Sequence, residues 1–172
     1  WTVEIDDADR IPELIARAVS TATSGRPGPV LIALPEDMLV ETTCAANALP
    51  VREVQANPAP EQIEEFAALL AQAERPLVVL GGSRWDEAAW QTFGELARRW
   101  DVPVTVSLRR QMLFSTENES FVGDLGFGPN PQLVAQVKAA DLIVLIGCRM
   151  SETPSQGYTL LDIPVPAQKL VH

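Results

Sequence analysis

The sequence is poor in the residues that most often perform acid-base catalysis and metal binding. Its 172 residues contain a single histidine, His172, and two cysteines, Cys44 and Cys148. No nucleophile-base pair can be built around the one histidine. Two cysteines without C-x-x-C spacing suggest neither a disulfide framework nor a structural zinc site, and they favour a reducing, cytoplasmic location. We therefore expect no catalytic residue and no metal ligand in this chain.

Positive charge and long apolar runs are also scarce. The chain has 13 Lys and Arg against 23 Asp and Glu, which gives a net charge of −10. Such a protein repels a phosphate backbone, so we expect no nucleic-acid partner. The longest apolar runs, such as residues 142–146, are far shorter than the roughly 20 residues of a membrane helix, so we expect a soluble protein.

The two ends of the sequence do not resemble natural ends. The first residue is Trp1 instead of methionine, and no charged and then apolar leader precedes the first helix pattern. The last residues, 170–172, resemble a strand that is just beginning. We expect the chain to be a piece of a longer protein.

The first part of the chain combines one helix with one strand. Apolar residues recur at helical spacing over residues 7–23, and Gly25 ends this pattern. Residues 30–34 are a continuous apolar run between prolines, which predicts a strand buried on both faces. Residues 36–60 have several prolines and no sustained period, which is typical of a linker.

From residue 61 onward, helix and strand patterns alternate. This alternation predicts an α/β fold, namely a Rossmann-like parallel sheet with helices on both faces, preceded by a helix-strand stump from an adjacent domain. Asn130 and Pro131 have the residue types of an N-cap and a first helical position. The predicted helices are 61–73, 85–100 and 131–139, and the predicted strands are 77–80, 102–108, 121–123 and 142–146.

The loops that follow the strands are the places to look for a ligand site. Gly81 and Gly82 follow one strand directly, and Ser83 is expected to cap the next helix, so free N–H groups there would receive a phosphate. The spacing is not G-x-G-x-x-G, and a tight turn that needs small residues is the preferred explanation of the two glycines.

Arginines follow two of the other strands. Arg109 and Arg110 come after the strand at 102–108, and Arg149 comes after the strand at 142–146. Guanidinium groups at one sheet edge would bind an anion in a bidentate manner. The alternative is that each arginine pairs with a nearby carboxylate or faces a neighbouring domain.

Gly123 and Asp124 invite comparison with a G-D-G metal-diphosphate motif. The third position is Leu125, and no asparagine pair follows at the expected distance. We assign Gly123 and Asp124 to a loop without a metal role.

An ordered series of segments resembles the thiamine-diphosphate-dependent enzymes, such as acetolactate synthase and benzoylformate decarboxylase. The resemblance implies that residues 1–42 are the tail of a pyrimidine-binding domain, 43–57 a linker and 58–172 the central domain. The matching segments are residues 24–35, 73–82, 102–104, 123–126 and 140–149.

The resemblance also implies a function for the longer protein. It would be an enzyme that uses thiamine diphosphate and Mg²⁺ to act on 2-oxo acids, by decarboxylation or carbon-carbon bond formation. The activating glutamate and the magnesium motif would lie outside residues 1–172, so this chain alone would be a catalytically inert scaffold. Its partners would be its own flanking domains and further copies, in a homodimer or homotetramer. Residues 1–42 are expected to pack on the central domain or to mediate self-association.

A second hypothesis is a module that binds an adenine nucleotide. Some relatives hold FAD or ADP in the central domain, and NAD is a further candidate for a stand-alone module. Arg109 and Arg110 lie where flavin-binding relatives tend to have other residues, which argues against FAD. The cofactor-binding candidates are Gly81, Gly82, Ser83, Arg109, Gly147 and Arg149.

Overall fold

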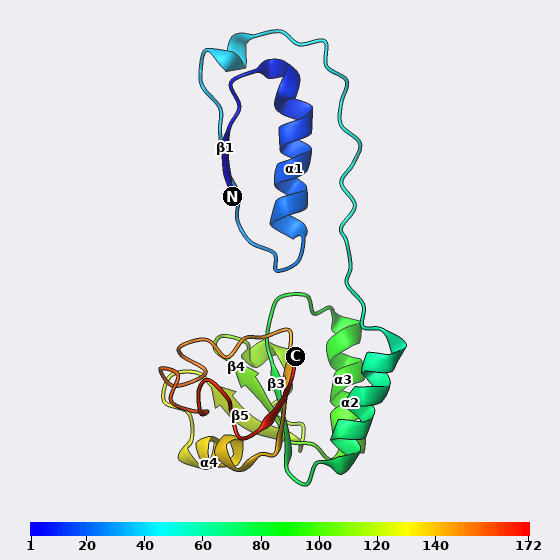
Figure 1. Ribbon diagram of the computed structural model, residues 1–172, viewed down its shortest axis with the longest axis vertical. Helices are drawn as coiled ribbons and strands as arrows, with labels where there is room; N and C mark the ends of the chain where they lie inside the picture. Colours follow the sequence, from blue (N-terminus) through cyan, green and yellow to red (C-terminus); the bar gives the residue numbers. More distant parts are fainter. The chain divides into compact units, whose positions relative to one another are not determined.

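The computed structural model describes all residues, 1–172, as two compact units (Figure 1). The first unit spans Trp1–Ala59 and the second spans Pro60–His172. None of the helices is both long and apolar enough to cross a membrane. The assignment of residues 1–42, 43–57 and 58–172 to particular domains stays a prediction.

The first unit is a two-stranded parallel sheet with one helix. Its small core consists of Ile5, Ala8, Leu14 and Met38. No helix or strand forms over residues 41–59. The elements of this unit are β1 (Thr2–Glu4), the 3-10 helix η1 (Ala8–Arg10), α1 (Ile11–Thr23), β2 (Leu31–Ala33) and the 3-10 helix η2 (Met38–Val40).

The helix expected over residues 7–23 is present, with a first turn of 3-10 type, but the burial expected for the following strand is wrong. Asp7 caps the 3-10 turn by accepting the N–H of Asp9, and the α-helix follows from Ile11 to Thr23. The strand β2 is not buried on both faces, since Leu31 is 59% exposed. The physical reason is that its sheet has only β1 as a second strand, a strand that the apolar pattern did not predict.

The second unit is built on a five-stranded sheet in which every pairing is parallel. The strand order is β5-β4-β3-β6-β7. Strands β3 and β6 pair along their whole length, from Pro76 opposite Leu142 to Leu80 opposite Ile146. The strands are β3 (Pro76–Leu80), β4 (Val104–Ser107), β5 (Phe121–Leu125), β6 (Leu142–Ile146) and β7 (Lys169–Val171).

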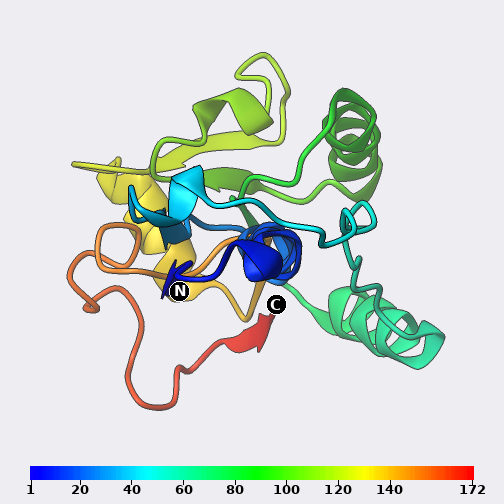
Figure 2. The same ribbon diagram turned by 90° about the horizontal axis from the view of Figure 1, so that it is seen from above.

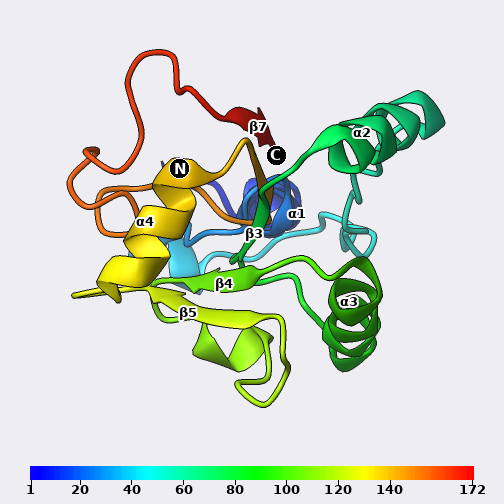
Figure 3. The ribbon, with the colours of Figure 1, turned by 90° about the horizontal axis from the view of Figure 1, so that it is seen from below.

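Helices cover both faces of this sheet, which confirms the predicted fold class (Figure 3). The helices α2 (Pro60–Gln72) and α3 (Glu87–Trp100) lie on one face, and α4 (Pro131–Ala139) lies on the other. Successive residues of each strand point to opposite faces. Val78 and Leu80 accordingly pack in the α2/α3 layer, while Leu77 and Val79 pack in the α4 layer.

Local signals in the sequence explain where some elements begin. Asn130 caps α4 through a hydrogen bond from Gln132 N–H, and Pro131 is the first helical residue, as predicted. The predicted strand over residues 121–123 is present but extends to Leu125, so the assignment of Gly123 and Asp124 to a loop is wrong. The pairing of β5 with β4 shifts register at this point, between Val104 and Thr105, and the Thr105 hydroxyl donates to the Gly123 carbonyl over 2.8 Å.

Candidate functional site

The loops that follow β3 and β6 lie against each other at the carboxyl edge of the five-stranded sheet. Figure 2 shows the second unit from above, with α2 and α3 (green) on one side and α4 (yellow) on the other. The strand order reverses between these two loops, because β3 has β4 on one side and β6 on the other. The Gly81 N–H donates to the Ile146 carbonyl over 3.0 Å, which ties the two strand ends together. Open parallel sheets bind ligands at such reversal points. The structure thus brings the predicted residues 81–83 next to 147–149.

The glycines of these two loops are required by the contact between the loops themselves. A Cβ atom on Gly82 would overlap the carbonyl oxygen of Gly147, and one on Gly81 would overlap the Cβ of Cys148. Gly82 and Gly147 also have φ values of +77° and +66°, in the left-handed region that favours glycine. The tight-turn explanation therefore accounts for all three glycines without a phosphate.

Two side chains fasten the loops to the sheet. The Trp85 indole N–H donates to the Gly81 carbonyl over 2.6 Å, and its ring meets Phe93 edge-on with centroids 6.0 Å apart. The buried Cys148 thiol donates to the Val79 carbonyl over 3.3 Å. Burial raises the pKa of Cys148 to about 11, so the thiol stays protonated near neutral pH. Sequence reasoning missed both hydrogen bonds, because the residue spacing does not show which backbone carbonyls face these side chains.

A carboxylate caps the amino end of α3, so the expectation that Ser83 caps this helix is wrong. Asp86 is the N-cap, and its Oδ1 accepts the Ala89 N–H over 2.7 Å. Glu87 adds a second negative charge in the first turn. The chain turns through residues 81–86 before the helix begins, which leaves Ser83 exposed in the connection. The negative side chains at this helix end oppose the binding of a phosphate there.

Two of the predicted arginines are exposed beside the same edge. Arg109 follows β4 and Arg149 follows β6, and no ion pair joins either one to a carboxylate in residues 1–172. The expected pairing with nearby acids is therefore not observed. Arg109 also has a φ of +59°, which is unusual for a residue with a side chain. The role of both arginines as cofactor contacts stays a prediction.

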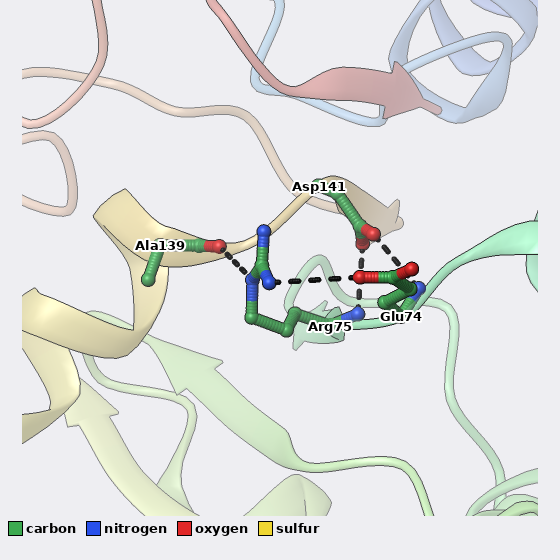
Figure 4. A network of polar contacts seen from close by, with 4 residues as sticks. All are labelled: Glu74, Arg75, Ala139 and Asp141. Carbon is green, nitrogen blue, oxygen red and sulfur yellow. Dashed lines mark hydrogen bonds and ion pairs between the residues drawn. The ribbon is translucent and has the colours of Figure 1, made fainter.

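A polar network joins the opposite, amino ends of β3 and β6 (Figure 4). The Asp141 carboxylate accepts the backbone N–H groups of Glu74 over 2.7 Å and of Arg75 over 3.0 Å. The Arg75 Nε donates to the Ala139 carbonyl over 2.7 Å. The N–H of Glu74, and then that of Arg75, lower the pKa of Asp141 below its usual value. This network ties the amino ends of the two central strands together. It therefore lies at the opposite edge of the sheet from the carboxyl-edge loops.

The His, Cys, Asp and Glu side chains of this chain are not gathered into clusters. No group of three or more His, Cys, Asp or Glu side chains within residues 1–172 is arranged to hold a metal ion. Asp124, the acid of the G-D-G comparison, accepts the Gly126 N–H over 2.9 Å and so closes a local turn. The residues present therefore do not fit a magnesium-diphosphate group.

Comparison with known proteins identifies related chains. The family model described as the thiamine pyrophosphate enzyme central domain matches residues 63–172. An acetolactate synthase from Mycobacterium bovis is 29% identical over 98% of this chain and 27% of its own length. The acetolactate synthase large subunit of Parasynechococcus marenigrum is 32% identical over 100% of this chain and 28% of its own length.

Solved structures resemble the chain as well. The thiamine diphosphate-dependent 4-hydroxybenzoylformate decarboxylase of Rhodococcus jostii aligns with a TM-score of 0.70 and 26% identity, over 100% of this chain and 33% of that one. A benzoylformate decarboxylase from Polynucleobacter necessarius aligns with a TM-score of 0.66 and 25% identity, over 86% of this chain and 28% of that one. The chain thus spans about a quarter of the length of the curated relatives that it matches.

Proposed function

The chain belongs to the thiamine pyrophosphate enzyme family and carries its central domain, and from this premise we propose that it is the scaffold domain of an enzyme acting on 2-oxo acids. The complete protein would use thiamine diphosphate and Mg²⁺, either to decarboxylate its substrate or to join two carbonyl compounds. Two relatives, an acetolactate synthase and a 4-hydroxybenzoylformate decarboxylase, support these two reaction types. We further propose a cytoplasmic homodimer or homotetramer.

The observation that carries the scaffold role is the direct packing of the two carboxyl-edge loops. Gly82 and Gly147 approach each other so closely that even a methyl group does not fit between the loops. The end of α3 is already occupied by the Asp86 carboxylate. The two loops therefore fill the carboxyl edge of the sheet, and Asp86 occupies the helix end beside it. Both features support a structural role for this edge. Thiamine diphosphate, when bound elsewhere in the complete protein, supplies the group that adds to the substrate carbonyl.

The test compares the complete protein with the chain of residues 1–172. Release of CO₂ from pyruvate and from benzoylformate is measured with and without thiamine diphosphate and Mg²⁺. We expect the complete protein to release CO₂ from one of these 2-oxo acids only when the cofactor is present, and the chain of 172 residues to release none. Turnover by the isolated chain, or turnover by the complete protein without thiamine diphosphate, would refute the proposal.

Adenine-nucleotide binding at the carboxyl edge is the less supported candidate. The exposed arginines Arg109 and Arg149 favour an anion there, whereas Asp86 opposes it. The melting temperature of the chain with FAD, ADP or NAD distinguishes the candidates. At about 100 times the dissociation constant a bound ligand stabilises by about 2.7 kcal/mol. A rise of several degrees with one nucleotide would establish this candidate, and no rise is expected from the scaffold proposal.

A further inference from the structure

A cleft lies between the outer side of α3 and the segment that leads into β5. It encloses about 360 Å³, within the range of about 300–1,000 Å³ that is usual for small-molecule sites. The carboxyl-edge loops, residues 81–83 and 147–149, take no part in it. The α3 wall carries Trp90, Gly94, Glu95 and Arg98, and the opposite wall carries Phe114, Ser115, Glu117 and Asn118.

Gly94 leaves room in the middle of this cleft. It is the eighth of the 14 residues of α3, an interior position where glycine weakens a helix relative to alanine. The fold of the chain does not require a glycine here. The nearest atom to an added Cβ would be Asn118 Nδ2 at 3.6 Å, which is an ordinary contact. Because Gly94 lines the cleft, the missing side chain keeps open a space that the chain does not fill itself.

The wall opposite α3 is held in place by its own hydrogen bonds. Asn118 Nδ2 donates to the Gly94 carbonyl over 3.2 Å, which ties this wall to the helix. The Ser115 hydroxyl accepts the Glu117 N–H over 3.2 Å, which closes a local turn. Phe114 is 3% exposed and anchors the segment in the core of the second unit. A ligand would therefore meet a preformed cleft and would not have to order it.

The side chains best able to bind a ligand have no partner within the chain. The Trp90 side chain is 37% exposed and forms no hydrogen bond or aromatic ring contact with another residue of the 172. Glu95, Glu117 and Arg98 form no ion pair, although only three positions separate Glu95 from Arg98 on the helix. One aromatic ring, one cation and two carboxylates are thus available in the same cleft.

The order of these groups along the helix defines what would fit. Trp90, Gly94 and Arg98 follow one another at intervals of four residues, so they lie in a row along one side of α3. The row places a ring and a guanidinium on either side of the gap at Gly94. Glu95 comes from beside this gap, and Glu117 comes from the opposite wall. These groups complement a ligand that has a ring, a carboxylate and an ammonium group.

We propose that this cleft binds a free aromatic α-amino acid. The carboxylate of the ligand pairs with the Arg98 guanidinium, and its ammonium group lies between Glu95 and Glu117. Its ring contacts Trp90, and its central carbon lies over Gly94. A ligand that has only one of the two charges leaves Arg98 or the two glutamates without a partner and binds more weakly. Binding here requires neither thiamine diphosphate nor the flanking domains of the complete protein.

The test uses three compounds that share a phenyl ring and differ in charge, namely L-phenylalanine, 2-phenylethylamine and 3-phenylpropionate. Each is titrated into the chain of residues 1–172 and followed by the indole N–H signals in proton-nitrogen NMR spectra. Trp90→Phe identifies the Trp90 signal among those of the four tryptophans. We expect phenylalanine to shift this signal with a dissociation constant on the order of 1 mM. The two compounds with a single charge are expected to bind at least about fivefold more weakly.

Variants of α3 test the position of the site. Arg98→Gln removes the partner of the carboxylate, so it weakens phenylalanine binding at least about fivefold and does not weaken 2-phenylethylamine. Arg99→Gln is the matched control, because Arg99 lies in the same helical turn and does not line the cleft; it leaves the dissociation constant unchanged. Gly94→Leu fills the cleft and weakens phenylalanine binding at least about tenfold. Its melting temperature is not expected to fall, since leucine favours a helix more than glycine does.

Three results would overturn the proposal. The first is a Trp90 signal that phenylalanine does not shift up to about 10 mM, ten times the expected dissociation constant. The second is a compound with a single charge that binds as tightly as phenylalanine, since one of the two charge contacts would then be absent. The third is equal weakening by Arg98→Gln and Arg99→Gln, which would show that only the overall charge of the helix matters.

Discussion

Replacing Gly82 with alanine tests whether the two carboxyl-edge loops pack directly on each other. Gly82 has a φ of +77°, and an added Cβ would overlap the Gly147 carbonyl oxygen. The left-handed backbone alone costs alanine about 1 kcal/mol relative to glycine. The overlap with backbone, which cannot rotate away, adds about 1–3 kcal/mol as the loops separate. We therefore expect Gly82→Ala to destabilise the chain by about 2–4 kcal/mol.

The matched control is Gly128→Ala. Gly128 also has a positive φ, +65°, but nothing lies within 4 Å of its added Cβ. This variant therefore measures the backbone cost alone, about 1 kcal/mol. Both variants are compared with the wild type by urea unfolding followed by circular dichroism, in which a change in midpoint at constant slope reports stability. Equal losses in the two variants would show that the loops do not touch, and the reasoning about the closed edge would be refuted.

Three further predictions concern single side chains. Iodoacetamide at pH 8 is expected to modify the exposed Cys44 in the native chain and to modify Cys148 only after unfolding, because its pKa is about 11; mass spectrometry of the native protein decides this. Asp86→Ala removes the cap of α3 and lowers stability by about 1 kcal/mol, whereas Asp86→Ser restores most of it in the same urea assay. The lowered pKa of Asp141 stabilises the fold fully above the unfolded value of about 4, and this stabilisation is lost as pH falls through the lower folded value. Asp141→Asn should therefore lower the melting temperature at pH 7 and differ less from the wild type near pH 3, and a constant difference would contradict this cause.

The alternation of apolar helices and strands was sufficient to predict the second unit. Strand β6 begins and ends where its apolar run does, because Leu142–Ile146 is buried on both faces and needs no polar alternation. The cap at Asn130 was equally visible, since the cap and the proline after it act within one turn. Both signals act within a single element, so no distant contact is needed to read them.

Other features depend on contacts that the sequence does not display. The strand Leu31–Ala33 is partly exposed because its sheet has only two strands. The residues of a strand do not reveal how many other strands lie beside it. Ser83 was a plausible cap by residue type, but the length of the turn after β3 gave that role to Asp86. The sequence placed the glycines in the loops after the strands. The reason that glycine is needed there became clear only from the close contact between Gly82 and Gly147.

The most direct measurement of the central claim is titration calorimetry with thiamine diphosphate and Mg²⁺, performed on the chain of residues 1–172 and on the complete protein. The account predicts saturable binding by the complete protein and no binding heat with the chain alone, since residues 1–172 contain no group of three or more His, Cys, Asp or Glu side chains that could hold a metal ion. Saturable binding by the isolated chain, or no binding by the complete protein, would contradict its role as the scaffold domain of a thiamine-diphosphate-dependent enzyme.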